Sequence, residues 1–271
     1  MRSVSKRKVT AEQVLELVDQ IRLEQPMLGT RKLYHLLKED LKSMGVGRDR
    51  LFAILRANHR LIVPKRQYRV TTNSHHRFRK HRDLISGLIP NRPEQIWVAD
   101  ITYLGSRTNP MYLAMITDAY SKKVIGYDVS DSLKTSGAIR ALKMAKKNRQ
   151  YPSKTLIHHS DRGFQYCSDD YQKVLKKARL KCSMTQTHDP YANAIAERIN
   201  GIIKQEYKLM EYQLGLKTMR QLVRESIETY NSRRPHLSCK MLTPNQMHQQ
   251  SKVKIKTYKN KNRIRFKPYP V

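Results

Sequence analysis

The sequence predicts an α/β fold in which a mixed five-stranded sheet carries helices on both faces, preceded by a small helical domain. Between residues 96 and 184, runs rich in β-branched and aromatic residues first follow one another closely and then alternate with helical segments. Strands joined by short connections pair antiparallel, whereas strands separated by helices are joined by crossovers and run parallel. Before residue 63, apolar residues recur instead at helical spacing.

The front of the chain reads as three short helices. A capping-box pattern at Thr10 and Gln13 predicts the start of the first helix, and Pro26 ends it. The second helix is expected from about 30 to 44 and the third from about 48 to 58, with glycines between them. Three helices with tight turns fit a helix-turn-helix-like module. Its candidate DNA contacts are Arg48, Arg50, Arg56 and Arg60. The alternative is a packing domain with a solvated basic face, because the face that would read DNA is not evident.

Regular patterning is lost between residues 64 and 92. This stretch is rich in lysine and arginine, so we interpret it as a basic linker that follows a DNA backbone. The pair His75-His76 suggests a metal site, but no pair of cysteines accompanies it, which favours solvent exposure.

The sheet and its helices are expected between residues 93 and 215. The predicted strands are 96–104, 110–117, 123–129, 155–159 and 181–184, and the predicted helices are 134–148, 168–178 and one that begins between 190 and 193 and ends near 209. We therefore divide the chain into a helical domain (1–63), a basic linker (64–92), a core (93–215), a helical extension of the core with a helix at 219–231 (216–250) and a basic tail (251–271). The tail is either disordered or a small strand pair on DNA.

The net charge of the chain is +32, from 54 basic and 22 acidic residues. Such an excess opposes compact folding unless a polyanion binds, and a phosphate backbone is the usual partner. A ribosome-associated protein is the alternative. The three cysteines are widely spaced, which argues against a disulfide framework or a structural zinc site. There is no apolar run of membrane-spanning length and no apolar segment after the basic start, so we expect a soluble, cytoplasmic protein.

Three acidic residues are candidates for a metal site. Asp100 lies in the first predicted strand, Asp161 follows the fourth, and Glu197 lies in a helix, 35 residues beyond Asp161. Strand ends and a neighbouring helix bring such distant positions together. Carboxylates are the ligands that Mg²⁺ prefers, and two such ions catalyse phosphodiester chemistry. The spacing alone is weak, because Glu206, Asp118, Asp128 and Asp169 are alternatives. His158 and His159 suit a supporting role better than ligation of a hard ion.

One face of the last core helix is unusually polar for a buried surface. Asn193, Glu197, Asn200, Gly201 and Lys204 recur at helical spacing along it. An acid, amides, a glycine and a lysine suit a surface that holds metal and lies against a phosphate backbone. This pattern predicts that the helix serves both the metal site and the DNA.

Several motifs resemble those of a known family. They are Trp97–Leu104 (WVADITYL), His159–Tyr166 (HSDRGFQY), Tyr191–Gly201 (YANAIAERING), Arg234–His236 (RPH) and Thr243-Pro244. Together they resemble the integrase catalytic core, specifically the second-reading-frame (OrfB) transposase of the insertion-sequence-three family. The resemblance covers roughly residues 90 to 250, and the helical front end is also similar to that family's helix-turn-helix-like region.

The resemblance implies a ribonuclease-H-like fold with a D,D(35)E triad at Asp100, Asp161 and Glu197. It implies Mg²⁺ or Mn²⁺ (two ions are expected), DNA cleavage, and strand transfer by a 3′-hydroxyl at insertion-sequence ends. Non-catalytic regulation of transposition and hydrolysis without joining are the alternatives. Besides Lys204, Asn193 and Asn200, the motif residues Arg162 and Arg198 are candidate DNA contacts.

The resemblance also implies partners beyond DNA. We expect a first-frame (OrfA) partner or a frameshift fusion with it, because no heptad zipper is present, and a homo-oligomer on DNA near the bacterial nucleoid. The chain departs from retroviral integrases, which are similar in the core, because it lacks the cysteines of their amino-terminal zinc domain.

Overall fold

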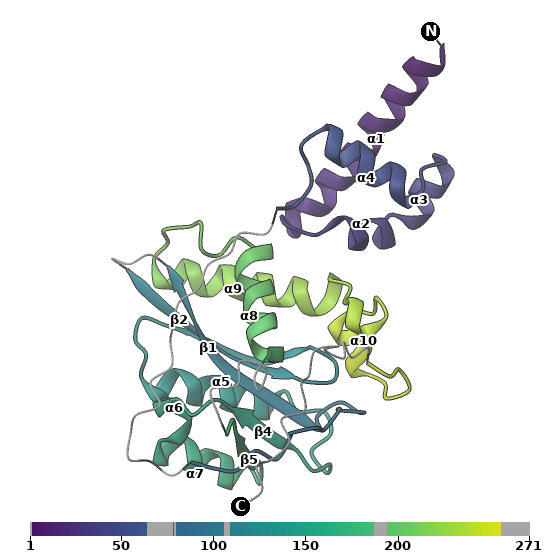
Figure 1. Ribbon diagram of the computed structural model, residues 1–271. Helices are drawn as coiled ribbons and strands as arrows, with labels where there is room; N and C mark the ends of the chain where they lie inside the picture. Colours follow the sequence, from purple (N-terminus) through teal and green to yellow (C-terminus); the bar gives the residue numbers. More distant parts are fainter. Residues whose placement is uncertain (1, 64–77, 79, 106–108, 187–193, 256–271) are drawn as a thin grey trace, which may run out of the picture.

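A computed structural model describes residues 2–63, 78, 80–105, 109–186 and 194–255, with side chains from residue 7 onward. Four helices form an N-terminal domain, and the rest of the chain forms a sheet with helices on both faces (Figure 1). The helix α8 (Ala194–Glu206) crosses the sheet, and one of its ends points toward the N-terminal helices (Figure 1). The predicted mixed sheet with a helical N-terminal region is confirmed.

The N-terminal domain contains α1 (Arg2–Glu24), α2 (Thr30–Leu36), α3 (Lys38–Ser43) and α4 (Arg48–Ala57). The predicted start of the first helix was wrong, because Thr10 lies inside α1 and no glycine or proline interrupts the residues before it. The predicted second helix is two helices, interrupted at Leu37, where ψ rises to 16°. Leu37 is nevertheless buried, so the break keeps both pieces on one core.

The sheet has five strands in the order β3-β2-β1-β4-β5. They are β1 (Ile96–Gly105), β2 (Pro110–Asp118), β3 (Val124–Ser130), β4 (Ile157–Ser160) and β5 (Lys181–Met184). β1, β2 and β3 are antiparallel neighbours, whereas β4 pairs parallel with both β1 and β5. The predicted switch from a meander to crossovers therefore occurs at β4.

Helices cover both faces of the sheet. On one face, α5 (Thr135–Lys147), α6 (Phe164–Cys167) and α7 (Asp169–Lys177) share an apolar core with Trp97, Ala99 and Ile101 of β1. On the other face, α8 and α9 (Leu216–Arg233) pack on the opposite side chains of β1, β2 and β3. The short helix α6 was not predicted, because the sequence indicated only a turn at Gly163.

Part of the predicted linker lies against the core. The amide of Met184 in β5 donates to the carbonyl of Arg82 at 3.3 Å, and the amide of Leu84 donates to Ser183 Oγ at 2.8 Å. Residues 80–84 therefore run beside β5 and are not a free connection. His75 and His76 lie outside the described residues, as does the tail beyond residue 255.

The C-terminal extension ends in a 3-10 turn at Leu237–Cys239 and in α10 (Pro244–His248), whose start is a capping box at Thr243 and Gln246. A buried polar cluster attaches α10 to the sheet. His248 Nδ1 lies 2.9 Å from Ser121 Oγ, and its ring lies between the carboxylates of Asp118 and Glu94, at 3.8 and 3.6 Å. Among the described helices, none is long and apolar enough to cross a membrane.

Candidate active site

Two of the three predicted acids lie side by side because of strand register. β1 and β4 run parallel, and Ala99 pairs with Ser160, so Asp100 and Asp161 are the next residues on neighbouring strands. The alternation of side chains along β1 turns Asp100 away from Trp97, Ala99 and Ile101 and toward the face that α8 covers. The topology thus brings two carboxylates to one point at the carboxyl end of β4.

The carboxyl group of Asp100 is held from two directions. The backbone amide of Ile101 donates to its Oδ1 at 2.9 Å, and the side-chain amide of Asn200 on α8 donates to its Oδ2 at 2.6 Å. Burial, followed by the charge of Asp161, raises the pKa of Asp100 to about 7 against the opposing effect of these donors. Because the charge of Asp161 opposes ionisation of Asp100, two negative charges at this point are unfavourable. A bound cation would make ionisation of both carboxylates favourable.

Asp161 is oriented by the turn that follows it. The amide of Gly163 donates to Asp161 Oδ1 at 3.0 Å, and α6 begins at the next residue, Phe164. A Cβ atom at position 163 would stand 3.0 Å from the same Oδ1, so a larger residue there would have to displace the carboxylate slightly, while the backbone conformation itself is an ordinary one. The Asp161-Arg162-Gly163 motif therefore encodes a tight Asx-type turn.

Glu197 lies in the first turn of α8 and is largely exposed. Partial desolvation of its carboxyl group, followed by the charge of Asp161, raises its pKa. Within the described ranges, however, no three His, Cys, Asp or Glu side chains are close enough to share one ion. Residues 187–193, which precede α8 and include the predicted contact Asn193, lie outside those ranges.

The alternative acids are engaged elsewhere. Asp118 is fully buried and accepts from the amides of Glu94 and Ser121, while Asp128 is paired with Arg140 at 2.8 Å. Glu206 binds Arg234 and Lys32, and Asp169 is exposed in the first turn of α7. These contacts favour Asp100, Asp161 and Glu197 over the alternatives.

The two neighbouring histidines of β4 are buried and bonded within the core. His158 Nε2 lies 2.9 Å from the hydroxyl of Tyr171, and burial lowers the pKa of His158 to about 3. His159 Nδ1 lies 2.9 Å from Ser183 Oγ on β5. Both therefore support the strand that ends at Ser160, directly before Asp161.

Asn200 has a different role from the one that its sequence pattern indicated. It was predicted to contact DNA, but only 4% of it is exposed and its amide is donated to Asp100. Its Oδ1 is buried without a hydrogen-bond partner among the described residues. The sequence did contain a pattern that placed Asn200 near the acids, because Asn200 lies one helical turn after Glu197 on the same face of the helix.

Tyr166 was quoted only as part of a motif, yet its ring is buried in the core against His158 and Tyr171. Its hydroxyl is buried and makes no hydrogen bond to any described residue. Burial, the neighbouring Tyr171 and the charges of Asp100 and Asp161 raise its pKa well above the ordinary value. The hydroxyl therefore stays neutral in the core.

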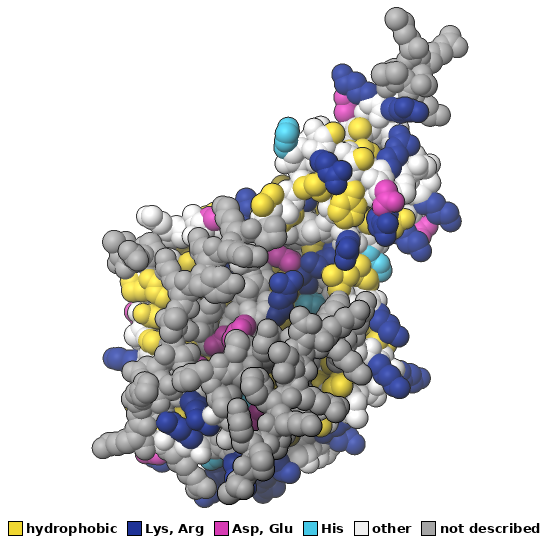
Figure 2. All heavy atoms as spheres, in the orientation of Figure 1, with side chains coloured by type: hydrophobic (Ala, Val, Ile, Leu, Met, Phe, Trp, Pro, Cys, Tyr) yellow, Lys and Arg dark blue, Asp and Glu magenta, His cyan; other side chains and the backbone are white. Residues whose placement is uncertain are grey.

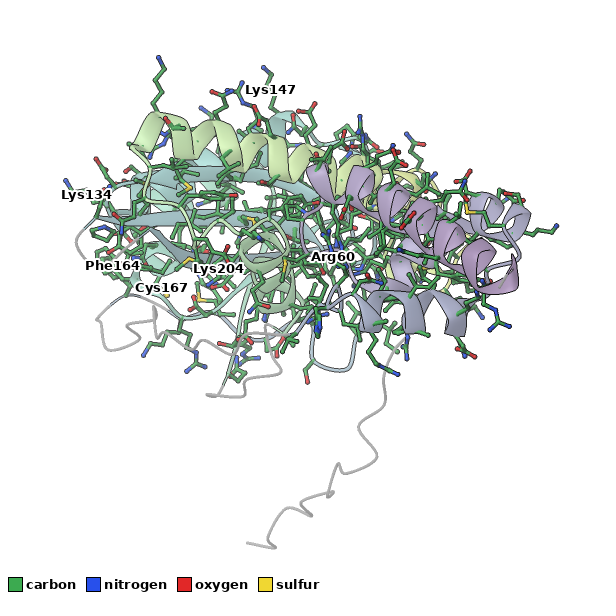
Figure 3. All side chains as sticks on the ribbon, turned by 90° about the horizontal axis from the view of Figure 1, so that it is seen from above. Arg60, Lys134, Lys147, Phe164, Cys167 and Lys204 are labelled. Atoms are coloured by element: carbon green, nitrogen blue, oxygen red, sulfur yellow. The ribbon has the colours of Figure 1, made fainter. Side chains whose placement is uncertain are left out.

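The remaining predicted DNA contacts lie on two surfaces. Arg48, Arg50 and Arg56 are exposed on or beside α4, where Arg48 is paired with Asp49. Arg48 and Arg56 line one open groove together with Arg31 and Phe52, which the sequence had not singled out. Arg60, labelled in Figure 3, is instead paired with Asp19 of α1 at 2.9 and 3.1 Å.

The second surface lies along α8 and the turn after β4. Arg198 is exposed, whereas Lys204 (labelled in Figure 3) and Arg162 are half-buried. Lys204 lies two helical turns beyond Glu197, on the same side of α8. Basic groups thus continue from the predicted site along the helix.

Comparisons with known proteins agree with this geometry. Two models of the integrase core domain match residues 90–190 and 178–244. The chain is 37% identical over 220 residues to an uncharacterized 31 kDa protein of insertion element IS600 from Shigella sonnei. The aligned region covers 80% of this chain and 79% of that protein. It is 38% identical over 160 residues to the transposase InsF of IS3fB from Escherichia coli, over 59% of this chain and 55% of InsF.

This chain belongs to the IS3 family of insertion-sequence transposases. The match spans about four fifths of the IS600 protein but only about half of InsF. The fold agrees with that of a chain in the structure of a simian T-cell lymphotropic virus intasome, with a TM-score of 0.52 and 19% identity over 85% of this chain and 78% of that one. The ribonuclease-H-like, integrase-core fold is thereby confirmed, and dependence on a divalent metal comes with this family.

Proposed function

We propose that this transposase cuts and joins DNA at insertion-sequence ends through Asp100, Asp161 and Glu197. The observation that carries the proposal is the strand register that sets Asp100 beside Asp161, under a helix with Glu197 in its first turn. Burial, followed by the charge of Asp161, raises the pKa values of Asp100 and Glu197, and a bound cation would offset both effects.

The residues fit two Mg²⁺ or Mn²⁺ ions. When bound, such ions stabilise the attacking 3′-hydroxyl as its oxyanion and stabilise the leaving oxygen. Asp100 and Asp161 would hold the pair from the sheet, and Glu197 would close the site from α8. Asn200 orients Asp100 through its amide, and its unpartnered Oδ1 is an acceptor available to a water in the site. Gly163 fixes the rotamer of Asp161 through its amide.

DNA is the substrate and the principal partner. The charge of +32 supplies the electrostatic attraction. Lys204, Arg198 and Arg162 are placed to hold the phosphates near the chemistry, and the groove that includes Arg48 and Arg56 is placed to hold the element end farther away. We further propose a homo-oligomer on DNA, a first-frame partner protein and a location at the bacterial nucleoid.

The test is a joining assay with the full chain, Mn²⁺ and duplex DNA carrying the element end, with and without the first-frame protein. Asp161→Asn should lower joining by more than about a thousandfold, roughly 4 kcal/mol of transition-state stabilisation, while DNA affinity is retained. Asp170→Asn, which removes an exposed acid from α7, is the matched control. Near-normal joining by Asp161→Asn would refute the triad.

The products of the same assay separate the alternatives. Nicked DNA without joined product would indicate a hydrolytic nuclease, and binding without either product would indicate a regulator. Joined product in the wild type, lost in Asp161→Asn, is the expected outcome.

A further inference from the structure

A single residue, Glu206, joins the N-terminal domain to the core through both its side chain and its backbone. Glu206, the last residue of α8, binds Arg234 through both oxygens, at 2.6 and 2.7 Å, and binds Lys32 of α2 at 3.2 Å. The backbone carbonyl of the same residue accepts from the amide of Met27 at 3.1 Å. Figure 2 shows basic and acidic side chains gathered where the N-terminal helices meet the rest of the chain.

This junction is polar and not part of a shared apolar core. In the part of the chain that the structure describes, the N-terminal apolar cluster draws only on residues 14–61. The other clusters draw only on residues from Phe78 onward. Domains joined without a large apolar interface move relative to each other unless specific contacts hold them. The contacts at Glu206 therefore decide how the N-terminal domain is oriented.

The junction is shielded enough for its charges to matter. The side chains of Lys32 and Glu206 are 11% and 17% exposed, and that of Arg234 is 2% exposed. Burial and the nearby charge of Arg234 lower the pKa of Lys32 to about 8, so Lys32 is held there by Glu206 against an unfavourable environment. A second pair at the rim, Arg233 with Glu24 of α1, joins the same two domains in a more exposed position.

The helix that ends at this junction is the one that begins at the predicted active site. Glu197 and Glu206 are nine residues apart on α8, which is about 14 Å of helix. Because the helix is continuous, a displacement at Glu206 is transmitted to Glu197. DNA that binds the arginine groove of the N-terminal domain is therefore held at a fixed distance from the acids only while the junction is closed.

We propose that Lys32 and Glu206 are positioning residues for the transposition reaction: their ion pair locks the DNA-binding domain to the carboxyl end of α8 and so places the element end in register with the acids. This proposal rests on the proposed function. Lys32 touches neither the metal site nor the arginine groove, so its role is one of orientation alone.

The experiment reverses the charge of Lys32 and leaves the Glu206–Arg234 pair in place. Lys32→Glu puts two carboxylates in contact, Lys32→Met removes the charge at similar volume, and Lys32→Arg retains it. Lys42→Glu, an exposed position on α3, makes the same change in net charge away from the junction. Each full-length variant is measured by small-angle X-ray scattering, by thermal unfolding and in the joining assay at saturating DNA.

We expect Lys32→Glu and Lys32→Met to increase the radius of gyration without lowering the unfolding temperature of either domain. At saturating DNA their joining rate should fall about tenfold, a typical size for coupling between sites, and their cleavage positions should scatter. Lys32→Arg and Lys42→Glu should behave like the wild type. A normal joining rate in Lys32→Arg would show that the other variants lose activity with the charge at position 32. A reduced joining rate at saturating DNA, together with an unchanged unfolding temperature, would show that neither DNA affinity nor folding accounts for the loss.

Two results would overturn the proposal. An unchanged radius of gyration in Lys32→Glu would mean that the ion pair does not hold the domains. An increased radius with unchanged joining rate and cleavage position would mean that their orientation does not matter for the reaction. If the wild type itself fails to join DNA, the proposed function fails, while the scattering still decides whether the junction is closed by Lys32.

Discussion

Asp161→Asn should make the metal-free protein more stable while it abolishes joining. The substitution removes a negative charge next to Asp100 and preserves shape, and an asparagine Oδ1 can still accept from the amide of Gly163. Loss of the charge should lower the pKa of Asp100, because Asp161 is the second cause of its elevation after burial. Opposite effects on stability and activity are typical of residues placed for function at the expense of folding.

The magnitude follows from the pKa of Asp100. A folded pKa of about 7 against an ordinary 3.8 means that the folded chain keeps a proton that the unfolded chain releases between about pH 4 and pH 7. Stability therefore falls as the pH rises through that window, by about 4 kcal/mol in all. Burial accounts for the largest part of the pKa elevation of Asp100, and the charge of Asp161 for a smaller part. Removal of Asp161 should therefore raise the free energy of unfolding by about 1 kcal/mol at pH 7.5, which corresponds to roughly 2–4 °C in the unfolding temperature.

The chain contains its own reporter for this measurement. Trp97, the single tryptophan, is fully buried in β1, three residues before Asp100, so its fluorescence follows unfolding of the core. In EDTA at pH 7.5, Asp161→Asn should unfold at a higher temperature than the wild type. In Mg²⁺ the wild type should gain stability by ligand linkage, and the variant should gain much less.

Asp170→Asn is the control, because it removes the same charge from an exposed site and raises the net charge equally. An unfolding temperature in EDTA below that of the wild type would refute the argument that the acids repel each other. So would an equal stabilisation of the wild type and Asp161→Asn by Mg²⁺, because the ion would then bind elsewhere.

The remaining predictions concern two supporting contacts. Asn200→Ala should weaken Mg²⁺ binding, measured by the same thermal shift, by about tenfold to a hundredfold, because Asp100 loses the donor that orients it; an unchanged shift would remove Asn200 from the site. His248→Gln should destabilise the core at pH 6 by about 2 kcal/mol, since the ring loses its contacts with Asp118 and Glu94. Burial lowers the pKa of His248, but the contacts with the carboxylates of Asp118 and Glu94 outweigh burial and raise the pKa. The deficit should therefore shrink as the pH rises through that raised value; a deficit independent of pH would show that the charge of His248 contributes nothing.

The order of strands and helices was predictable because each core element carries its own local signal. The close spacing of the first three strands predicted the meander, and the alternation after Asn148 predicted the crossovers, as the order β3-β2-β1-β4-β5 confirms. Helix ends were less predictable. A capping box is only a local preference, and nothing before Thr10 interrupts the helix, so α1 starts at Arg2. The break at Leu37 reflects packing of both flanking helices on one core, which no local pattern encodes.

Motifs predicted the acids of the proposed site, but they did not predict the environment of those acids. The motif around Asp161 contains both the acid and the glycine whose small size leaves room for its carboxylate, so residue type and local geometry agree. Asn200 was assigned to DNA because an amide on a polar helix face looks exposed in sequence. Only the tertiary arrangement, in which α8 crosses β1, turns its side chain toward Asp100. Lys32 and Glu206 are 174 positions apart in the sequence. Local sequence patterns cannot predict a contact between residues so far apart.

These observations make α8 the element on which the functions of the chain converge. Its first turn presents Glu197, its next turn positions Asp100 through Asn200, Lys204 continues the basic surface, and Glu206 binds the N-terminal domain. The opposite face packs through Ile199, Ile202 and Ile203 into the core, so the helix is held by apolar burial and leaves its polar side for these contacts. The same rigidity that fixes the position of Glu197 therefore makes the proposed site sensitive to the orientation of the N-terminal domain. A chain built this way can require correct docking of DNA before its acids and their metal are correctly aligned.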